Sequence, residues 1–505
     1  MKEQFDVVVV GAGNAAMCAA LAARQAGARV AVLESAPFDS RGGNTRYAAG
    51  QMRIAFGDSE NLLQLVSDGD AAQFGSFDID PYGETDFFDD VARLTQYRVD
   101  PTLMDVISGQ SFATLRWMRE LGVRFQLSTG RQAHKIGGRF QFWGNLPCEA
   151  WGGGAGMLDA YYKKAAAEGV TVLFDTPAMR LLVDGDAIRG VEVLRNGACE
   201  ELGARAVVLA CGGFEANAEM RATYLGPNWD LAKVRGSRYN TGRGLKMALE
   251  LGARACGQIG GAHSTCWDLN APEYGDLIVG DSYQKHSYPL GIMVNARGER
   301  FLDEGADFRN YTYAKYGAEL LRQPGMFAWQ VFDQRAVSML RDEYRIRQVT
   351  RVKADTIEEL AAQLDGVDGK TFLRTVAEFN GAVPAGDPPI NIGIKDGRGT
   401  RGLAVPKSNW AYPIDRGPFE AYAVTTGITF TFGGLKITPQ AEVEEHGGKP
   451  INGLYAAGEI IGGLFYHNYP GGSGLTAGAV FGKIAGTAAG AHALGVQGKS
   501  PVVRG

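Results

Sequence analysis

The N-terminal segment constrains the fold more than any other part of the sequence. Residues 5–10 read FDVVVV, an apolar, β-branched run of strand length, and GAGNAA follows it directly. Residues 17–25 are rich in alanine and lack glycine and proline, which predicts a helix, and residues 29–33 (RVAVL) predict a second strand that ends at Glu34. The order strand, glycine turn, helix, strand and acid is typical of a dinucleotide-binding βαβ unit.

Each position of this unit has a physical role. Gly11 allows the tight turn, Gly13 lets the backbone approach a pyrophosphate, and Ala16 lets the helix pack closely on the strand. The helix N-terminus faces the phosphates, and Glu34 can accept hydrogen bonds from a ribose diol, which does not distinguish FAD from NAD. The predicted cofactor contacts here are Gly11, Gly13, Asn14, Ala15, Ala16, Glu34 and Ser35.

The composition excludes several classes of protein. The net charge of −5 and the absence of a Lys/Arg run argue against nucleic-acid binding. No apolar stretch is long enough to span a bilayer, and the first strand leaves no room for a signal peptide, which predicts a soluble cytoplasmic protein. The six cysteines have no C-x-x-C, haem or ferredoxin spacing, so we expect buried free thiols, no metal centre, and electron transfer to another molecule.

A second glycine-centred loop, SRGGNTR at residues 40–46, follows Glu34 closely. It could be an ordinary surface turn, but its position suits backbone N–H groups that lie along a pyrophosphate or a flavin edge. Here the chain resembles the flavoprotein subunits of the fumarate reductase and succinate dehydrogenase superfamily, in which this loop runs beside the isoalloxazine. Covalent members carry a histidine where this chain has Asn44, so the resemblance implies non-covalent FAD. The contacts expected from the loop are Arg41, Gly42, Gly43, Asn44 and Thr45.

The resemblance extends over nearly the whole chain. Residues 210–214 (ACGGF) resemble the A-T-G-G segment of flavoproteins with two dinucleotide-binding domains, with Cys211 in place of threonine. The C-terminal part returns to the cofactor, and Ser473 is expected to cap a helix whose positive end faces the flavin pyrimidine. Two separated halves that share one cofactor favour FAD over NAD. The further expected FAD contacts are Gly154, Ala178, Cys211, Gly212, Gly213, Asn240, Thr241, Gly242, Gly458, Glu459, Ser473, Gly474, Leu475 and Thr476.

The predicted fold class is α/β, a Rossmann-like FAD-binding domain of the glutathione-reductase type with an inserted α+β capping domain. We expect the FAD-binding domain at residues 1–255 and 417–505 and the cap at residues 256–416. A cap that closes over the flavin would exclude water. The expected cap elements are a hairpin of residues 292–294 and 300–302 and helices over residues 335–341, 357–364 and 369–381. Residues 131–151 could line a substrate pocket, but we favour packing.

Arg309 is the predicted proton carrier. In fumarate reductases a cap hairpin of the type V-N-x-x-G-x-R-F precedes an arginine that exchanges a proton with the substrate, and here VNARGERF at residues 294–301 precedes Arg309, one residue further away. Without the resemblance, we would favour an ion pair between Arg309 and a nearby acid: Asp303, Glu304 or Asp307. Asp307 and Tyr311 are the expected proton relay.

Other positions depart from the fumarate reductases. The histidine and arginine expected in the C-terminal part fall at Thr429 or Phe430 and at Tyr469, a site that would hold a C4 dicarboxylate poorly. The stretches 304–311 and 465–474 look more like tricarballylate dehydrogenase, and the Tyr-Pro-Gly element also recurs in 3-ketosteroid Δ1-dehydrogenases. We expect His467 and Tyr469 to face the flavin.

The leading hypothesis is an FAD-dependent dehydrogenase that oxidises a saturated CH–CH bond of a small carboxylic acid by hydride transfer to flavin N5. Tricarballylate to aconitate is the reference reaction, and the catalytic candidates are Arg309, Tyr469, His467 and Tyr311. The alternatives are a 3-ketosteroid Δ1-dehydrogenase, a fumarate-reductase-like ene-reductase, and a flavoprotein electron carrier without an organic substrate. The resemblance also implies a separate membrane-associated electron acceptor.

Overall fold

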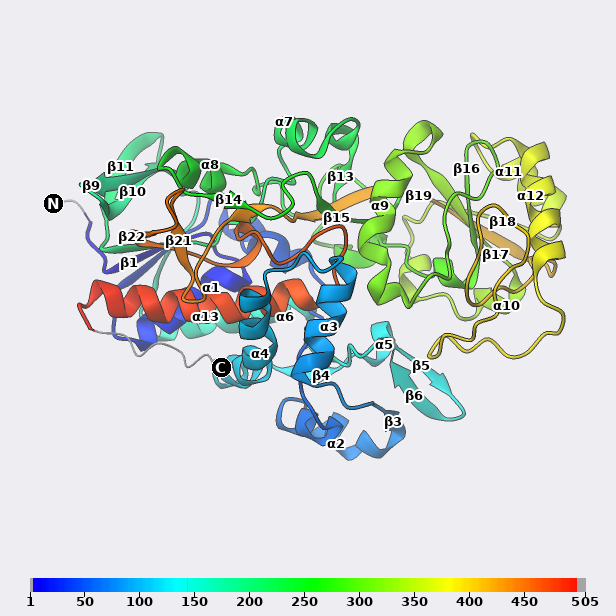
Figure 1. The fold of residues 1–505 in the computed structure, drawn as a ribbon, viewed down its shortest axis with the longest axis horizontal. Coiled ribbons are helices and arrows are strands. Elements are labelled where there is room, and N and C mark those ends of the chain that lie inside the picture. Colours follow the sequence, from blue (N-terminus) through cyan, green and yellow to red (C-terminus); the bar gives the residue numbers. More distant parts are fainter. Residues whose placement is uncertain (1–2, 143, 497–505) are drawn as a thin grey trace.

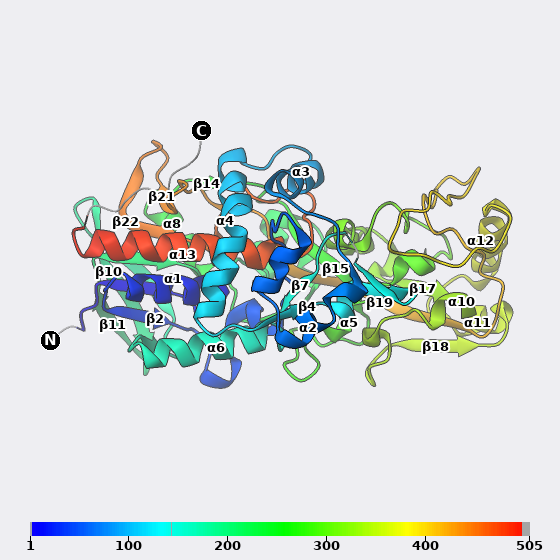
Figure 2. The same ribbon diagram turned by 90° about the horizontal axis from the view of Figure 1, so that it is seen from below.

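The computed structural model describes residues 3–142 and 144–496, and these form two lobes along one long axis (Figures 1 and 2). The first lobe is built on a nine-stranded sheet with the order β11-β10-β22-β12-β1-β2-β8, to which β21 and β9 are added. Its centre is parallel: β1 (Val7–Val10) lies between β2 (Val30–Leu33) and β12 (Ala206–Leu209). The four valines of β1 are buried, as expected for a strand covered on both faces.

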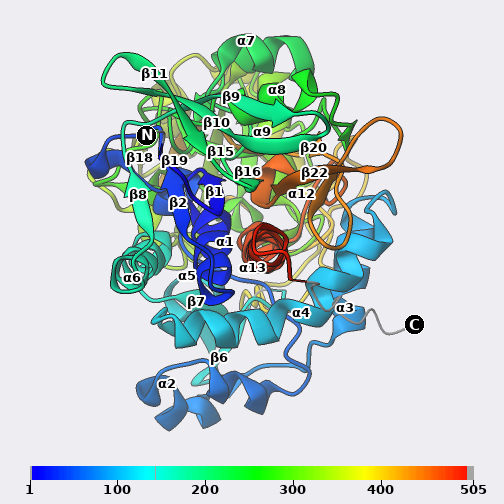
Figure 3. The ribbon, with the colours of Figure 1, turned by 90° about the vertical axis from the view of Figure 1, so that its left-hand side faces the viewer.

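Two helices pack side by side against this sheet, α1 (Asn14–Gln25) and α13 (Ser473–Ala493), as the end-on view shows (Figure 3). Their backbones approach closely because small residues face each other. A side chain added to Gly482 or Gly486 of α13 would strike the backbone of α1 at Ala15 or Ala19. The alanine-rich and glycine-rich compositions of the two segments therefore bring the N-terminal and C-terminal parts of the chain together.

The predicted βαβ unit and the α/β fold class are confirmed. The remaining strands of the large sheet are β8 (Thr171–Leu173), β9 (Ala178–Asp184), β10 (Ala187–Arg195), β11 (Ala198–Gly203), β21 (Glu442–Glu444) and β22 (Pro450–Ala456). The remaining helices of the first lobe are α2 (Asp68–Ala72), α3 (Glu84–Leu94), α4 (Pro101–Glu120), α5 (Thr129–Gln132), α6 (Gly153–Ala167), α7 (Ala218–Met220) and α8 (Arg243–Glu250). Small sheets are formed by β3 (Phe77–Asp78), β5 (Ala133–Ile136) and β6 (Arg139–Phe142), by β4 (Phe125–Leu127) with β7 (Cys148–Ala150), and by β14 (Ala255–Cys256) with β20 (Gly434–Leu435).

The second lobe is a six-stranded sheet with its own helices, at the right of Figure 1. The strands are β13 (Lys233–Val234), β15 (Ala262–Asp268), β16 (Ile292–Asn295), β17 (Ala328–Phe332), β18 (Arg351–Ala354) and β19 (Phe419–Thr431), and the helices are α9 (Tyr313–Leu321), α10 (Gln334–Val337), α11 (Ile357–Gln363) and α12 (Gly369–Ala382). Phe372, Val376 and Phe379 of α12 pack on this sheet in a core separate from that of the first lobe. The long strand β19 belongs to this sheet, and its C-terminal end leads back to the first lobe.

The predicted cap hairpin is wrong in its second arm. β16 pairs with β17, and residues 300–302 contribute only one isolated bridge, between Val294 and Arg300. The chain leaves the strand there because the Arg300 side chain bonds Glu304 and the carbonyl oxygen of Val405. The helix predicted over residues 335–341 is also shorter than expected, since α10 ends at Val337.

All six cysteines are free thiols, but only Cys18, Cys148 and Cys266 are buried, whereas Cys211 and Cys256 are half-buried and Cys199 is exposed. Across the described part of the chain, no helix combines the length and apolar character needed to cross a bilayer. In the same residues, His, Cys, Asp and Glu side chains form no cluster suited to a metal ion.

Candidate active site

A large pocket, with a cavity of about 560 Å³, lies where the two lobes meet. One end of it is formed by the segments that follow four parallel strands: β1, β2, β12 and β22. The carboxyl ends of parallel strands meet at one edge of a sheet, which is where α/β proteins bind nucleotides. We call this the cofactor end of the pocket, and the opposite end, toward the second lobe, the substrate end.

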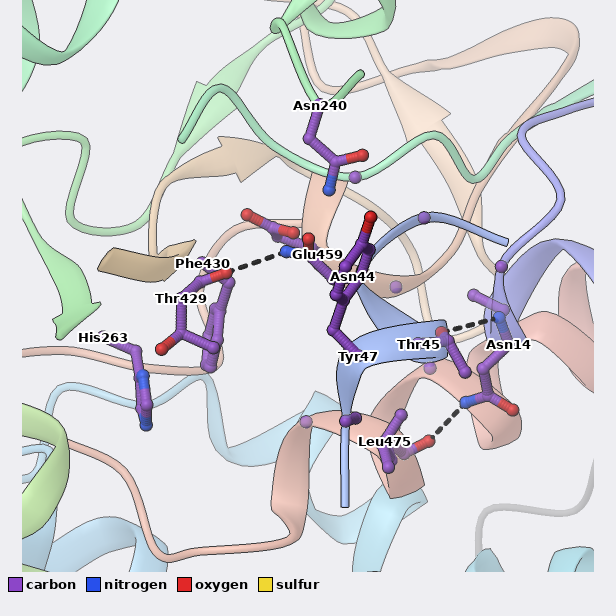
Figure 4. A pocket seen from close by; sticks show the side chains of 18 of the residues that line it. Asn14, Asn44, Thr45, Tyr47, Asn240, His263, Thr429, Phe430, Glu459 and Leu475 are labelled. Carbon is purple, nitrogen blue, oxygen red and sulfur yellow. Dashed lines mark hydrogen bonds between the residues drawn. The ribbon is translucent and has the colours of Figure 1, made fainter. Parts of the chain in front are cut away.

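The start of α1 lies at the cofactor end. The backbone N–H of Asn14 donates to Thr45 Oγ1 at 3.0 Å, and its side-chain Nδ2 donates to the carbonyl oxygen of Leu475 at 2.8 Å (Figure 4). These bonds tie the first helix, the second glycine loop and the start of α13 together. The positive ends of two helices therefore lie at the same part of the pocket, an arrangement that favours phosphate groups.

Glu34 also lines this end and is only 5% exposed. Its carboxylate accepts hydrogen bonds from the backbone N–H groups of Ala36 and Gly42, each at 3.0 Å. Burial raises the pKa of Glu34, and these backbone bonds oppose the shift. A carboxylate fixed in this way has acceptor capacity left for a ribose diol.

A pair of acids, the buried Glu215 and the half-buried Glu459, adjoins the middle of the pocket. Glu215 Oε1 accepts from the side-chain amides of Asn44 and Asn240, each at 2.6 Å, and Glu459 accepts from the backbone N–H of Thr431 at 2.8 Å. Burial raises the pKa of both acids, and the charge of Glu215 raises that of Glu459 further. Glu215 was not predicted from the sequence, although an acid directly after the Gly212-Gly213-Phe214 segment is a visible signal.

Most of the predicted FAD contacts line the pocket. They are Gly11, Gly13, Asn14, Ala15, Glu34, Ser35, Gly43, Asn44, Thr45, Ala178, Cys211, Gly212, Asn240, Thr241, Gly242, Gly458, Glu459, Gly474 and Leu475. This set fits FAD, because it offers glycine backbone, two helix N-termini and a ribose acceptor along one continuous wall. Gly11, Gly13 and Gly43 would lie at the phosphates, Glu34 at the adenosine ribose and Glu459 at the ribityl chain.

The other predicted contacts lie behind the wall and support it. Gly42 donates its N–H to Glu34, Gly154 packs on the carbonyl of Thr45, and Gly213 packs on the Glu459 carboxyl group. The rest are Ala16, which is fully buried, Arg41, which bonds the carbonyl of Phe38, Ser473, which bonds the carbonyl of Pro470, and Thr476, which bonds the carbonyl of Arg53. The N-cap of α13 is Gly472 rather than Ser473, because Gly472 adopts a φ of 85° and its backbone turns the chain into the helix.

Four arginines from distant segments line the substrate end. Arg309 is 4% exposed, and its guanidinium donates to the carbonyl oxygen of Arg131 and, at 3.0 Å, to Gln132 Oε1. Asp281 pairs with both Arg131, at 3.2 Å, and Arg235, and Glu343 lies 3.4 Å from Arg341. The full set of guanidinium groups is Arg131, Arg235, Arg309 and Arg341.

The positive charge at this end exceeds the negative charge. Four guanidinium groups face two carboxylates, those of Asp281 and Glu343. Burial lowers the pKa of Arg309, and burial together with the charge of Arg309 lowers the pKa of Arg341 to about 9. A bound anion would relieve this repulsion.

Two neutral histidines complete the substrate end. His263 of β15 and His286 are each 1% exposed, and burial lowers the pKa of both well below the usual range. Three ring nitrogens have no hydrogen-bond partner among the described residues: Nδ1 and Nε2 of His263 and Nε2 of His286. Buried polar atoms that lack a hydrogen-bond partner in the protein indicate a bound ligand or water. Tyr313 lies against both imidazole rings, and its hydroxyl bonds that of Tyr469 at 2.7 Å.

Most residues of the substrate end were not predicted from the sequence. Arg131 and Gln132 line the pocket, whereas packing was expected for their segment. The other residues come from separate loops, a strand and the start of α9, and they form no local sequence motif: Arg235, His263, His286, Tyr313 and Arg341. The one available sequence signal was the polar run His263, Ser264 and Thr265, which the structure places in β15.

Two predicted catalytic residues do not reach the pocket. His467 adopts a φ of 59° and is exposed, and its backbone N–H donates to Gln258 Oε1 at 2.6 Å. Tyr311 directs its hydroxyl to Asp90 at 2.8 Å and to the carbonyl of Gly144 at 3.0 Å. Asp307 pairs with Arg93 and Lys395, so neither expected relay residue points to the Arg309 guanidinium.

The simple ion-pair interpretation of Arg309 is not supported either. Glu304 pairs with Arg300, Asp303 bonds Ser408, and Asp307 is engaged as described above. Arg309 and Tyr469 both line the pocket.

Comparisons with known proteins agree with this geometry. A family model described as an FAD binding domain matches residues 6–475. A probable fumarate reductase of Shewanella frigidimarina (strain NCIMB 400) is 29% identical over 500 residues, which cover 97% of this chain and 76% of that protein. A 3-oxosteroid 1-dehydrogenase of Mycolicibacterium smegmatis is 26% identical over 569 residues, which cover 94% of each protein. A solved structure of the open conformation of a flavocytochrome c3 fumarate reductase has a TM-score of 0.71 at 29% identity, and covers 97% of this chain and 79% of that one.

The family match spans most of the chain and includes both separated halves of the cofactor wall. The site offers a dinucleotide wall at one end and a cationic, imidazole-lined chamber at the other. The chain therefore belongs to the FAD-binding family of the fumarate reductase and succinate dehydrogenase flavoprotein superfamily, and it is an FAD-dependent oxidoreductase that acts on CH–CH groups.

Proposed function

We propose that this enzyme oxidises a saturated CH–CH bond next to a carboxylate in a small polycarboxylic acid, with tricarballylate to aconitate as the reference reaction. The observation that carries this proposal is the charge imbalance at the substrate end, where four guanidinium groups face two carboxylates. An acid with two or three carboxylates would neutralise the excess and bond several guanidinium groups at once.

In the proposed reaction, different residues of the chain have different roles. FAD, when bound, accepts a hydride from one carbon of the substrate. Arg309 exchanges the proton at the carbon next to the carboxylate, and burial favours its neutral form, which makes it a better base than an exposed arginine. Arg235 and Arg341 stabilise the negative charge that develops on the carboxylate, and the neutral imidazoles of His263 and His286 hydrogen-bond the substrate.

A 3-ketosteroid Δ1-dehydrogenase is the second candidate. The paired hydroxyls of Tyr313 and Tyr469 line the pocket and could bind a ketone oxygen, which favours this activity. A steroid, however, carries no charge to balance the arginines. An ene-reductase would use the same residues in the reverse direction, and an electron carrier would have no use for the unpartnered imidazoles.

We also propose that FAD is held without a covalent bond and is reoxidised by a separate membrane-associated acceptor. Asn44, at the position where covalent members carry histidine, uses its amide to bond Glu215 and the carbonyl of Thr429, which supports a non-covalent flavin. Acid precipitation should leave the yellow colour in the supernatant. Flavin that remains in the pellet would contradict this proposal.

Anaerobic reduction of the bound flavin tests the substrate class. The purified holoenzyme is mixed with tricarballylate, citrate, succinate, propionate or 4-androstene-3,17-dione, and loss of the flavin absorbance is followed. We expect rapid bleaching by a polycarboxylate with a saturated CH–CH bond and none by the steroid. Bleaching by the steroid alone would assign the second candidate, and no bleaching by any compound would reject the dehydrogenase direction.

A further inference from the structure

The short turn η9 (Arg309–Tyr311), which carries the proposed proton carrier, is bonded directly to the first lobe. The backbone N–H of Gly471 donates to the carbonyl oxygen of Asn310 at 2.9 Å, and Asn468 Nδ2 donates to the carbonyl oxygen of Tyr311 at 2.7 Å. Both donors lie in the loop that leads into α13, the helix expected to face the flavin. We call η9 the arginine turn. It is therefore bonded directly to the loop that precedes α13.

A buried arginine secures the same loop from the other side. Arg53 is fully buried, and its Nε donates to the carbonyl oxygen of Gly471 at 3.0 Å. The Gly471 residue is thus held twice, through its N–H by the arginine turn and through its C=O by Arg53. The carbonyl oxygen of Arg53 in turn accepts from Thr476 Oγ1, in the first turns of α13, at 2.8 Å.

The side chain of Tyr311 connects the arginine turn to Arg53. Its hydroxyl bonds Asp90 at 2.8 Å, and Asp90 also accepts from Tyr82 at 2.8 Å and lies 3.5 Å from the Arg53 guanidinium. The guanidinium carbon of Arg53 lies 5.2 Å from the centre of the Tyr311 ring. We call Arg53, Asp90 and Tyr311 the Arg53 cluster. It binds both the arginine turn and the loop before α13 without contributing a residue to the pocket lining.

We propose that the Arg53 cluster, with Asn468, is a positioning device that holds Arg309 at a fixed place relative to α13 and the flavin. The proposal rests on the proposed proton role of Arg309. Proton and hydride leave neighbouring carbons of one substrate, so the base and the flavin must keep their spacing to a fraction of an ångström. The second lobe has a separate hydrophobic core, so its packing alone would leave this spacing free to vary. Bonds across the two lobes remove that freedom.

Matched tyrosine variants test this inference. Tyr311→Phe and Tyr82→Phe each remove one hydroxyl bond to Asp90, but only Tyr311 belongs to the arginine turn. Asn468→Ala removes the other side-chain bond to the turn. The readouts are deuterium exchange at the Gly471 amide in the FAD-loaded protein, FAD occupancy, and the rate and solvent isotope effect of flavin reduction by the acid identified above.

We expect Tyr311→Phe and Asn468→Ala to speed exchange at Gly471, to slow flavin reduction about 10- to 100-fold with an increased solvent isotope effect, and to leave KM and FAD occupancy nearly unchanged. Tyr82→Phe should change the rate less than about threefold, since it leaves the turn bonded. Equal effects of the two tyrosine variants, or a loss that follows FAD occupancy, would overturn the inference. If no acid reduces the wild-type flavin, the proposed function fails, while unchanged exchange at Gly471 would separately refute the link between turn and loop.

Discussion

The two ends of the pocket are built on different principles. At the cofactor end, contacts come from backbone groups, glycines and helix N-termini that follow four neighbouring strands. At the substrate end, they come from charged and aromatic side chains such as Arg131, Arg235, His263 and Arg341, which lie far apart in the chain. The cofactor end therefore tolerates changes in side chains that do not fill the wall, whereas the substrate end depends on single side chains.

This comparison also explains why fold and cofactor do not identify the substrate. Relatives of similar identity are named as fumarate reductases and as 3-oxosteroid dehydrogenases. A wall made of backbone groups can be shared among such enzymes, while a few side-chain replacements at the other end change the ligand.

The largest effect is expected at Arg309. Arg309→Lys should lower turnover by at least about 100-fold, the usual scale for a displaced acid–base group, because lysine cannot place its charge and proton in the same geometry. FAD occupancy should stay unchanged, since Arg309 lies at the substrate end. Steady-state rates and the flavin absorbance of the purified variant measure both. A variant with wild-type turnover would move the proton role elsewhere, first to Tyr469.

Arg341→Gln should raise KM for a polycarboxylate about tenfold or more, with a smaller change in kcat, because one charged hydrogen-bond partner of the substrate is lost. The pKa of Arg341, lowered to about 9 by burial and by the charge of Arg309, adds a pH test. Below this pH the group is charged and binds the anion, and above it the charge is lost, so KM should rise as pH increases through about 9. The exposed Arg347→Gln is the matched control and should change neither value.

At the cofactor end, Glu34→Ala should weaken FAD binding about tenfold, since a charged acceptor for the ribose is lost and the N–H groups of Ala36 and Gly42 lose their partner. The kinetics of the fraction that retains FAD should match the wild type. Titration of the apoprotein with FAD and active-site-normalised rates measure the two quantities. An altered substrate KM in the loaded variant would show that the ends are coupled.

The smallest effect separates two neighbours in one loop. Tyr469→Phe should lower turnover several-fold because Tyr469 lines the pocket and bonds Tyr313, whereas His467→Phe should leave turnover within about twofold, as for most surface substitutions. Rates on the same acid compare the two variants directly. A stronger effect of His467→Phe would mean that this loop rearranges when substrate binds.

The sequence by itself determined the cofactor half of this protein. The FDVVVV run, the Gly11–Gly13 turn and Glu34 are neighbours in the chain, and local chain geometry is enough to place them around a nucleotide. The same holds for Asn44 and for the Gly458-Glu459 segment, which carry family motifs. Glu215 could be predicted only in part. The sequence shows an acid close to a glycine pair, but it does not show that this acid bonds Asn44 and Asn240.

Only the tertiary structure decided which side chains form the substrate end. His467 and Tyr469 are two residues apart, yet His467 adopts a positive φ and is exposed while Tyr469 lines the pocket. Asp307 and Tyr311 are close to Arg309 in sequence but bond partners in the first lobe. Arg235, His286 and Arg341 meet Arg309 because the second sheet and its loops fold over the pocket. Contacts between residues so far apart depend on packing of whole elements, and no local pattern in the chain encodes them.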